Sequence, residues 1–322
     1  MKALIVHQYG PADQHGIAQA AVPEPASGEV RVRVRAVGLG FVDGLKMRGL
    51  YQTKDPLPFV LGTEFAGNVD AAPDGHFKKG DRVFGTVRNG ALAEYVVASA
   101  DELQALPADV SFAQAAGVMV NYSTALYALR EIAKLEPAES LLVLGAAGGT
   151  GTAAIHVGKL LGATVIAAAS SEPKRAFAIA MGADQVIDYT GSNWRDRLKE
   201  MTGGNGVNVI FDGVGGEMSP LAFRSLAWRG RHLVVGFAAG SIPALPFNIA
   251  LLKGAALMGV DLAQVRRREP EINDSIKATL SDWLARGLLK PGLEIYRFED
   301  FAAAFGSMAQ RKAIGKVVVT IE

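Results

Sequence analysis

The chain contains no cysteine among its 322 residues. This absence excludes disulfide bonds, cysteine-ligated zinc and a cysteine nucleophile. Histidine is scarce, and the five copies show no metal-ligand spacing: His7, His15, His76, His156 and His232. We therefore expect no metal site, and we expect His156 to lie on the solvated side of its helix.

Charge of one sign and long apolar runs are also scarce. The formal net charge is +1, and the longest block of like charge is the short run from Arg266 to Arg268. Such a balance gives no strong field that would attract nucleic acid or an anionic membrane. The longest uncharged stretch, between Glu139 and Lys159, is interrupted by glycines, and the N-terminus is too short in apolar residues for a signal peptide. We expect a cytoplasmic protein without a nucleic-acid or membrane partner.

The first ~120 residues show the period-2 alternation of β-strands. Residues 30–35 alternate valine with arginine, which predicts a strand with one solvated face. A short helix is expected from Phe41 to Arg48, ended by Gly49. A longer helical segment begins near Ser111, a plausible N-cap residue.

From Ser140 to about Val260, apolar strands alternate with helical segments. We expect strands at "SLLVLG", "TVIAAA", "QVIDY", "VNVIFDG", "RHLVVGF" and "AALMGV". Strand–helix alternation with apolar strands predicts an α/β fold with a doubly wound parallel sheet. A closing strand, "GKVVVTIE", is expected to return to the first, β-rich domain.

The turn "GAAGGTG" lies between a strand and a helix. Ala146, Gly148 and Gly151 fit the G-x-G-x-x-G pattern with alanine in first place. Glycines allow a tight turn and a close approach of the backbone to a pyrophosphate, while the helix N-terminus supplies N–H groups. The candidate cofactor-binding residues of this turn are Ala146, Ala147, Gly148, Gly149, Thr150 and Gly151. The alternative is a tight turn in an α/β protein that binds no nucleotide.

The end of the following strand favours NADPH over NADH. About twenty residues after Gly148, an NAD-binding protein usually carries an acidic residue for the ribose 2′-OH. Here the chain reads "AAASSEPKR". Ser170 and Ser171 can donate hydrogen bonds, and Lys174 supplies a positive charge, which suits a 2′-phosphate. The alternative is that Ser171 only caps the next helix and Lys174 is a solvated surface residue.

Several motifs in order along the chain resemble the zinc-free quinone oxidoreductase branch of the medium-chain dehydrogenases/reductases. They are "GFVDGLKMRGLY", "LGTEFAG", "GDRVFG", "LAEYVV", "NYSTALYAL", "GAAGGTG", "GADQVIDY", "FDGVGG" and "RKAIGKVVV". The resemblance implies a GroES-like catalytic domain from residues 1–121 and 262–322, and a Rossmann NADP-binding domain from residues 122–261. It also implies a cofactor in the cleft and a homodimer.

The resemblance sharpens the expectation of metal-free chemistry. Zinc-dependent relatives carry a Gly-His-Glu segment, whereas "LGTEFAG" places Thr63 at the histidine position. Without a metal to polarise an alcohol, the implied reaction is hydride transfer from NADPH to a quinone or an α,β-unsaturated carbonyl. An enoyl or acryloyl thioester reductase is one alternative. A non-catalytic NADPH-binding structural or RNA-binding homologue is another.

Catalytic candidates come from "GFVDGLKMRGLY". Family members often read Asn-Phe-x-Asp here, and this chain has Gly40 in place of the asparagine, which removes one expected hydrogen-bonding group. Asp43 and Tyr51 hold matching positions, and a phenol at Tyr51 can donate a proton or hydrogen-bond an enolate oxygen. The alternatives are a surface ion pair between Asp43 and Lys46 and a packing role for Tyr51.

The remaining cofactor candidates also follow from the resemblance. Thr124 is expected near the nicotinamide ribose and Tyr189 near the adenosine phosphate. Gly236, Phe237 and Ala238 follow a parallel strand, at the end where ligands bind in open sheets. The alternatives are a helical threonine bonding its own backbone, a strand-end tyrosine and a core phenylalanine.

Overall fold

The computed structural model describes all 322 residues and divides the chain into two compact units. Unit 1 comprises Met1–Val120 and Lys277–Glu322, and unit 2 comprises Asn121–Ile276. We predicted a return to the first domain at residue 262, but residues 262–276 group with unit 2. Hydrogen bonds of Tyr127 to Glu269 and of Arg130 to Ser275 hold this segment there.

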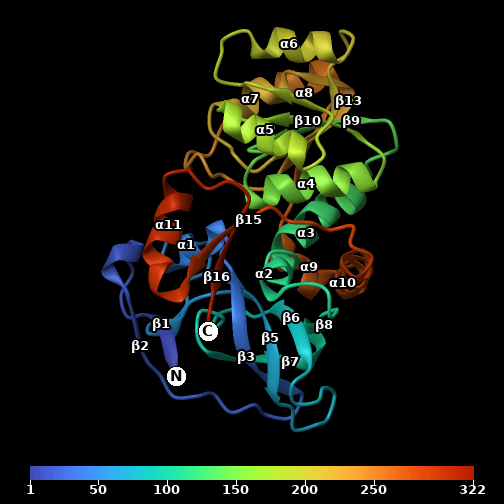
Figure 1. The fold of residues 1–322 in the computed structure, drawn as a ribbon. Helices are drawn as coiled ribbons and strands as arrows, with labels where there is room; N and C mark the ends of the chain where they lie inside the picture. The colour runs from blue at the N-terminus through green and yellow to red at the C-terminus, as the bar shows by residue number, and fades with distance from the viewer. The chain divides into compact units, whose positions relative to one another are not determined.

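Unit 1 is built on a seven-stranded sheet of order β15-β16-β3-β5-β6-β8, with β7 also paired to β3, and a three-stranded sheet of order β2-β1-β4 (Figure 1). Its strands are β1 (Lys2–Val6), β2 (Gly16–Gln19), β3 (Glu29–Gly38), β4 (Phe59–Val60), β5 (Glu64–Ala71), β6 (Arg82–Thr86), β7 (Tyr95–Ser99), β8 (Leu103–Ala105), β15 (Leu293–Arg297) and β16 (Lys316–Thr320). The closing strand β16 pairs antiparallel with β3, as expected.

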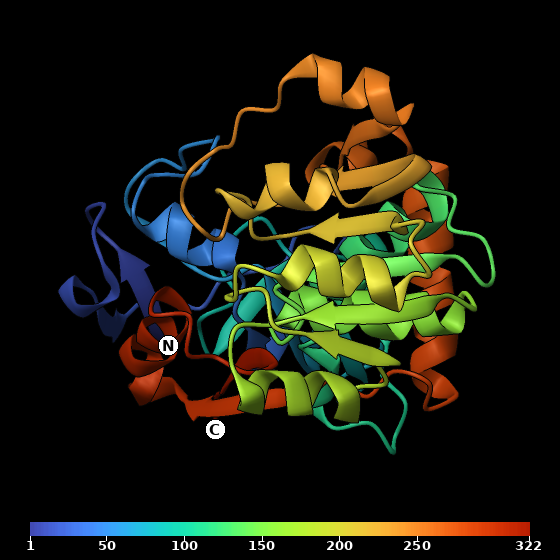
Figure 2. The same ribbon diagram turned by 90° about the horizontal axis from the view of Figure 1, so that it is seen from above.

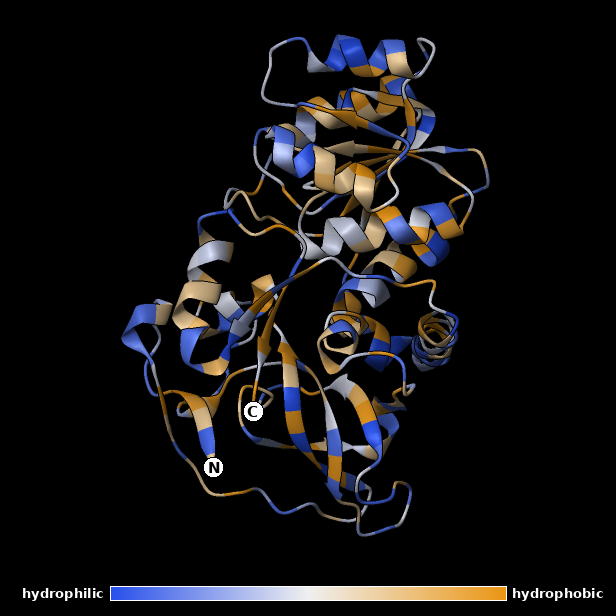
Figure 3. Cartoon of the chain, in the orientation of Figure 1, coloured by the Kyte–Doolittle hydropathy of each residue, from blue (hydrophilic) through white to orange (hydrophobic).

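The alternation in β3 has the predicted cause. Val30, Val32 and Val34 are buried, whereas the arginines between them are half-buried or exposed, and the two colours alternate along β3 in Figure 3. Unit 1 also contains α1 (Phe41–Met47), α2 (Phe112–Ala115), α11 (Phe301–Ala309) and the short 3-10 turns Ala12–Gln14, Ala100–Glu102 and Phe298–Asp300. Gly49, with φ 67°, follows α1, and the Ser111 side chain caps α2.

Two helices cross the boundary between the units in sequence: α3 (Met119–Leu126) and α10 (Pro270–Ala285). A six-residue π-helix, Tyr127–Ile132, continues α3. The predicted helical segment after Ser111 is therefore helical but interrupted. No helix of the chain is long and apolar enough to cross a membrane.

Unit 2 is a six-stranded parallel sheet of order β11-β10-β9-β12-β13-β14, which is the predicted doubly wound arrangement (Figure 2). Its strands are β9 (Ser140–Leu144), β10 (Thr164–Ala168), β11 (Gln185–Ile187), β12 (Val207–Asp212), β13 (Leu226–Val234) and β14 (Ala256–Gly259). Its helices are α4 (Gly149–Leu160), α5 (Glu172–Ala180), α6 (Trp194–Met201), α7 (Met218–Phe223), α8 (Phe247–Lys253) and α9 (Leu262–Arg268).

Both faces of this sheet are covered, which explains its nearly continuous apolar strands. Leu142 and Leu144 of β9 belong to a core with α6, α7 and α8. Leu141, on the opposite face, lies against α4, where a Cβ at Gly158 would come within 2.7 Å of it. Successive residues of a strand thus meet different helix layers.

Candidate cofactor and acceptor sites

The glycine turn connects β9 to α4 as predicted. Gly148 is the N-cap residue of α4 in an extended conformation, and α4 begins at Gly149. The first N–H groups of a helix have no acceptor within that helix, so those of Gly149, Thr150 and Gly151 are the candidates to bond an anion here. The N–H of Ala146 is already bonded to the Ala168 carbonyl, so this group does not contribute.

The glycines of this turn differ in what requires them. A Cβ on Gly151 would lie 2.3 Å from the Gly145 carbonyl oxygen and 2.8 Å from Ala146 Cα, so close packing of helix on strand excludes any side chain there. A Cβ on Gly148 would meet nothing closer than 3.5 Å. The protein itself therefore tolerates a side chain at 148, and close approach of a ligand is the remaining physical reason for this glycine.

Two hydrogen bonds join α3 to α4 beside the turn. Thr150 Oγ1 donates to Asn121 Oδ1 at 3.2 Å, and Tyr122 Oη lies 2.6 Å from His156 Nδ1. Our prediction of a solvated His156 is wrong: the side chain is half-buried against Tyr122, and burial lowers its pKa. Thr124 is half-buried on a helix whose neighbouring residues are buried, so its side chain faces outward from that core.

The end of β10 carries the predicted serines. Ser170 is exposed, and Ser171 is the N-cap residue of α5, but its hydroxyl makes no capping hydrogen bond. The structure thus gives no support to capping as the role of that hydroxyl. Lys174 is half-buried in the first turn of α5.

Arg175, which also follows this strand, is engaged elsewhere. Its guanidinium lies 2.9 Å from Asp188 and donates to the Ala169 carbonyl. The Arg175 guanidinium is therefore already paired without a bound ligand. Tyr189 lies just beyond β11 and packs, partly buried, against the core of unit 2. Because β10 and β11 are parallel neighbours, Tyr189 and Ser170 follow strands that end at the same edge of the sheet.

The loop after β13 contains the last predicted cofactor residues. Gly236 and Phe237 are half-buried, and Ala238 is exposed. The Gly236 N–H donates to the Asp212 carbonyl and the Ala238 N–H to the Gly213 carbonyl, so the loop is tied to the turn after β12.

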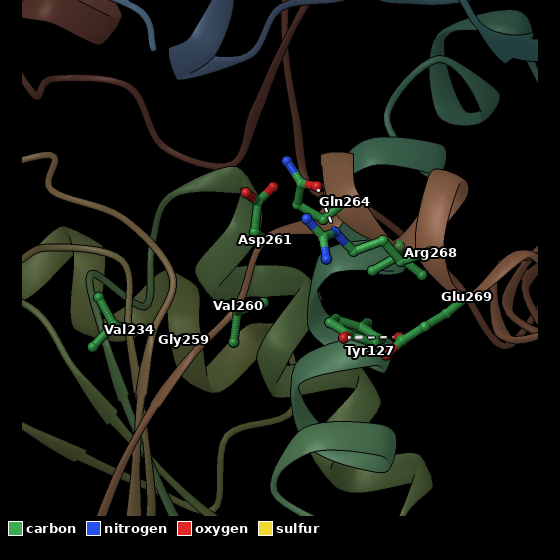
Figure 4. Close-up of a pocket in the computed structure, with 9 residues that line it drawn as sticks. Tyr127, Val234, Gly259, Val260, Asp261, Gln264, Arg268 and Glu269 are labelled. Carbon is green, nitrogen blue, oxygen red and sulfur yellow. Dashed lines mark hydrogen bonds between the residues drawn. The ribbon is translucent and has the colours of Figure 1, made fainter.

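A cavity of about 400 Å³, which the sequence did not reveal, opens at the carboxyl ends of β13 and β14 (Figure 4). Val234 and Val260 line one side, and Tyr127 and Glu269 the other. Tyr127 Oη donates to Glu269 at 3.0 Å, and burial together with this hydrogen bond raises the pKa of Tyr127 to about 12. Tyr127 is the first residue of the π-helix, a distortion that is frequent at functional sites and that no pattern in the sequence indicates.

In unit 1, Asp43 is completely buried and belongs to a hydrogen-bond network rather than to the surface. Its carboxylate accepts from the Gly40 N–H at 2.7 Å and from the Thr63 hydroxyl at 3.2 Å. The alternative of a surface ion pair with Lys46 is wrong, because Lys46 is buried and its ammonium donates to the Arg88 carbonyl and to Asn89 Oδ1. Burial raises the pKa of Asp43.

A buried ion pair lies near Asp43 and was not foreseen. Lys316 Nζ is 2.8 Å from Glu64 Oε2, and the two side chains are 3% and 0% exposed. Glu64 also accepts the Val120 N–H at 2.9 Å. Burial raises the pKa of Glu64 against the opposing effect of Lys316. The partners are 252 residues apart in the sequence, so no local sequence pattern predicts the pair.

Tyr51 is half-buried in the segment between α1 and β4. Asp55, four residues later, anchors this segment: its carboxylate is bonded by Arg88 at 2.7 Å and lies 3.7 Å from Lys46 Nζ. Tyr9 donates to the Asp55 carbonyl at 2.8 Å. These contacts anchor the segment at Asp55, and the catalytic role of Tyr51 stays a prediction.

No group of three or more His, Cys, Asp or Glu side chains in the chain is arranged to hold a metal ion. Thr63, at the position of a zinc ligand in the resembling family, uses its hydroxyl to bond Asp43. The metal-independence of the reaction itself stays a prediction.

Comparison with known proteins is consistent across sequence and structure. Residues 26–108 match the alcohol dehydrogenase GroES-like domain, and residues 149–278 match the family described as zinc-binding dehydrogenase. A quinone oxidoreductase-like protein 2 from Rattus norvegicus is 38% identical over 309 residues, which cover 94% of this chain and 88% of the relative.

Two solved structures extend the likeness. The Escherichia coli quinone oxidoreductase complexed with NADPH superimposes with a TM-score of 0.91 at 30% identity, covering all of both chains. The CurK enoyl reductase superimposes with a TM-score of 0.90 at 26% identity, covering 100% of this chain and 99% of the other. The chain is therefore an oxidoreductase that belongs to the medium-chain dehydrogenase/reductase family, in its quinone oxidoreductase branch.

Proposed function

We propose that this protein is an NADPH-dependent reductase that delivers hydride to a quinone or a related electron-poor alkene. The observation that carries the proposal is the end of β10, where Ser170, Ser171 and Lys174 stand in place of an acidic residue. A carboxylate at the strand end would repel a 2′-phosphate, whereas hydroxyls and an ammonium bind one. The nearby Glu172 lies past the strand, in the first turn of α5, where it favours the helix dipole. The similar Escherichia coli enzyme was solved with NADPH, which supports the same choice.

The order of strands supports one direction for the proposed cofactor across the sheet. The candidate 2′-phosphate site follows β10, the anion-binding helix end follows β9, and the cavity of Figure 4 follows β13 and β14. An extended dinucleotide with its adenosine at β10 and its pyrophosphate at α4 therefore brings the nicotinamide toward the ends of β12 to β14. Gly236, Phe237 and Ala238 lie in that part of unit 2.

NADPH supplies the hydride when it is bound. The residues of this chain hold the acceptor and manage the proton. Tyr51 is proposed to hydrogen-bond or protonate the acceptor oxygen, since a phenol is protonated at neutral pH. Asp43 is completely buried and accepts hydrogen bonds from Gly40 and Thr63, so we propose that it fixes the N-terminus of α1 rather than contacting the acceptor.

The cofactor proposal is tested by Lys174→Ala. Its dissociation constant for NADPH is expected to rise about tenfold or more, because a phosphate loses a charged partner, while that for NADH changes little. Lys199→Ala, an exposed lysine of α6, is the matched control and is expected to leave both values unchanged. Equal weakening of NADPH and NADH in Lys174→Ala would remove the phosphate role.

The enoyl thioester reductase is a second candidate, supported by the likeness to the CurK enoyl reductase. NADPH oxidation should be followed with a quinone, an enone and an enoyl-CoA in parallel. Turnover with the quinone or enone supports the main proposal, and a preference for enoyl-CoA supports the alternative. Tight NADPH binding without any turnover supports a non-catalytic role.

We also propose a homodimer formed through β14. This strand is the last of its sheet, so its outer edge has no neighbour within the chain. Large apolar side chains around it are exposed, among them Trp228, Phe247, Leu251, Leu252 and Leu257. Exposed apolar patches of this kind mark association surfaces, and an edge strand can pair with a second copy. Sedimentation of Leu251→Asp against wild type tests this, since an unchanged mass would reject the interface.

A further inference from the structure

Asp212 is the last residue of β12, and its carboxylate makes four hydrogen bonds near the carboxyl ends of the strands. Oδ1 accepts the N–H groups of Val214 and Gly215, both at 2.9 Å. Oδ2 accepts the Ser219 hydroxyl and lies 3.0 Å from His232 Nε2. Burial opposes ionisation, but the hydrogen bonds from His232, Ser219 and Gly215 hold the pKa of Asp212 below its ordinary value. The carboxylate is therefore ionised and its four partners are donors.

The turn that Asp212 organises touches both neighbouring cofactor segments. A Cβ on Gly145, at the start of the glycine turn, would lie 2.9 Å from Val214. A Cβ on Gly215 would lie 2.8 Å from Phe237, in the loop after β13. The Val214 carbonyl accepts the Ala239 N–H at 2.7 Å. A shift of the turn therefore moves the segments on both sides of it.

His232 is the member of this network that lies farthest from the edge. It is 1% exposed in β13 and its ring stacks on Phe223 at 5.8 Å. Since Asp212 accepts, Nε2 carries the hydrogen, and Nδ1 has no hydrogen-bond partner. A leucine would fill such an apolar place without leaving a polar atom unsatisfied. The imidazole is thus explained by its bond to Asp212 and not by packing.

We propose that His232 and Asp212 are positioning residues that set the turn after β12 and thereby the binding of the nicotinamide half of the cofactor. The inference rests on the proposed function, because it assumes that the nicotinamide lies at the ends of β12 to β14. Neither side chain is required to touch the cofactor. Their effect passes through the N–H groups of Val214 and Gly215.

The test separates the two halves of the cofactor. Adenosine 2′,5′-bisphosphate carries the adenosine half alone and should bind at the β10 side, far along the sheet from β13. In His232→Leu, the dissociation constant for NADPH is expected to rise about tenfold, the effect of losing one hydrogen bond to a charged group, while that for the bisphosphate stays within twofold. His232→Gln places an amide N–H near the position of Nε2 and is expected to restore NADPH binding.

Two further variants cover a failure of His232→Leu to fold. Ser219→Ala removes another donor to Asp212 with little change in volume, and the same selective loss of NADPH is expected. Phe223→Leu removes the stacked ring but keeps the donor, so it should lower the melting temperature without selective loss. Equal weakening of NADPH and bisphosphate, or no weakening in His232→Leu and Ser219→Ala, would overturn the proposal.

Wild-type binding distinguishes this failure from that of the proposed function. If wild type binds NADH and adenosine 5′-monophosphate but not the 2′-phosphorylated ligands, the choice of NADPH is wrong. The same comparison then proceeds with NADH and adenosine 5′-monophosphate. Selective loss of NADH in His232→Leu would still support the positioning role.

Discussion

Replacement of Lys316 by methionine should be far more damaging than its place near the C-terminus suggests. The ammonium lies 2.8 Å from Glu64, and both side chains are almost completely buried. Removing one member of such a pair leaves an unpaired buried charge, which costs about 3–5 kcal/mol. With an unfolding entropy of about 2.1 cal/mol/K per residue, each kcal/mol lowers the melting temperature of a 322-residue chain by about 1.5 °C, so Lys316→Met should melt roughly 4–7 °C lower.

The loss should depend on pH with a definite sign. Burial raises the pKa of Glu64, and Lys316 opposes this rise. Without Lys316 the pKa rises further above the unfolded value of about 4.3. A carboxyl with a raised folded pKa contributes its full stability below the unfolded pKa and loses it as the pH rises through the folded pKa. The deficit of Lys316→Met should thus be small near pH 4–5 and largest near pH 8.

The assay is urea unfolding at pH 5 and pH 8 of wild type, Lys316→Met, Glu64→Gln and the double variant. Glutamine keeps an acceptor for the Val120 N–H, so the double variant should recover most of the loss. Lys312→Met, at an exposed position, is the control and should stay within about 0.5 kcal/mol of wild type. A deficit below about 1 kcal/mol at pH 8, an equal deficit at both pH values, or no recovery in the double variant would refute the reasoning.

Three further predictions concern the cofactor and acceptor sites. Gly151→Ala should melt well below wild type, because its Cβ would lie 2.3 Å from the Gly145 carbonyl. Gly148→Ala should melt like wild type but bind NADPH more weakly. Thermal melts and cofactor titrations measure both effects, and a destabilised Gly148→Ala beside an unaffected Gly151→Ala would contradict the reasoning. Gly40→Asn restores the family residue with its Cβ 3.3 Å from Asp43 Oδ2, and it should lower KM for the acceptor; an unchanged KM in steady-state assays would show that position 40 does not orient the acceptor. Dialysis against a chelator should leave turnover intact, whereas a loss that zinc restores would contradict the metal-free mechanism.

The elements of unit 2 could be predicted because their signals are local. Each expected strand of the parallel sheet exists, because short apolar runs lie between helical segments; β9, β10 and β12 are largely buried, whereas the edge strand β14 is mostly exposed. The glycine turn could also be predicted, because the contact that excludes a side chain at Gly151 is local: it is made with Gly145, six residues earlier. The residue count from Gly148 to the end of β10 then located the candidate phosphate site.

The errors and omissions share a different origin. His156 was expected to be solvated, but Tyr122, on another helix, covers it. Lys46 was weighed as a surface partner of Asp43, but it is buried, and its ammonium donates to the Arg88 carbonyl and to Asn89 Oδ1. Periodicity predicts which face of an element is apolar, and it does not predict which distant segment lies against the other face. Pairs such as Glu64–Lys316 and Asp212–His232 are therefore visible only in the folded chain.

The functional predictions also differ in how well they are supported. The cytoplasmic location and the absence of a nucleic-acid partner rest on net charge and apolar run length alone, and they stay predictions. The oxidoreductase family, by contrast, is established by relatives that cover nearly the whole chain. Fold and family thus follow from many residues, whereas the acceptor depends on a few, of which Gly40 departs from the family pattern.

The buried carboxylates of unit 1 are compensated by other residues of the chain, and one of these residues stands at a position that holds a zinc ligand in zinc-dependent relatives. Asp43 and Glu64 are completely buried, and burial raises the pKa of both. The Lys316 ammonium offsets this penalty for Glu64, and the Thr63 hydroxyl donates to Asp43. Thr63 stands where zinc-dependent relatives carry a histidine, so the residue that removes a metal ligand also stabilises a buried carboxylate. Chelation and Lys316→Met therefore test this group of buried charges in two ways. Chelation asks whether turnover needs a metal ion, and Lys316→Met asks whether the fold needs the Lys316 ammonium beside Glu64.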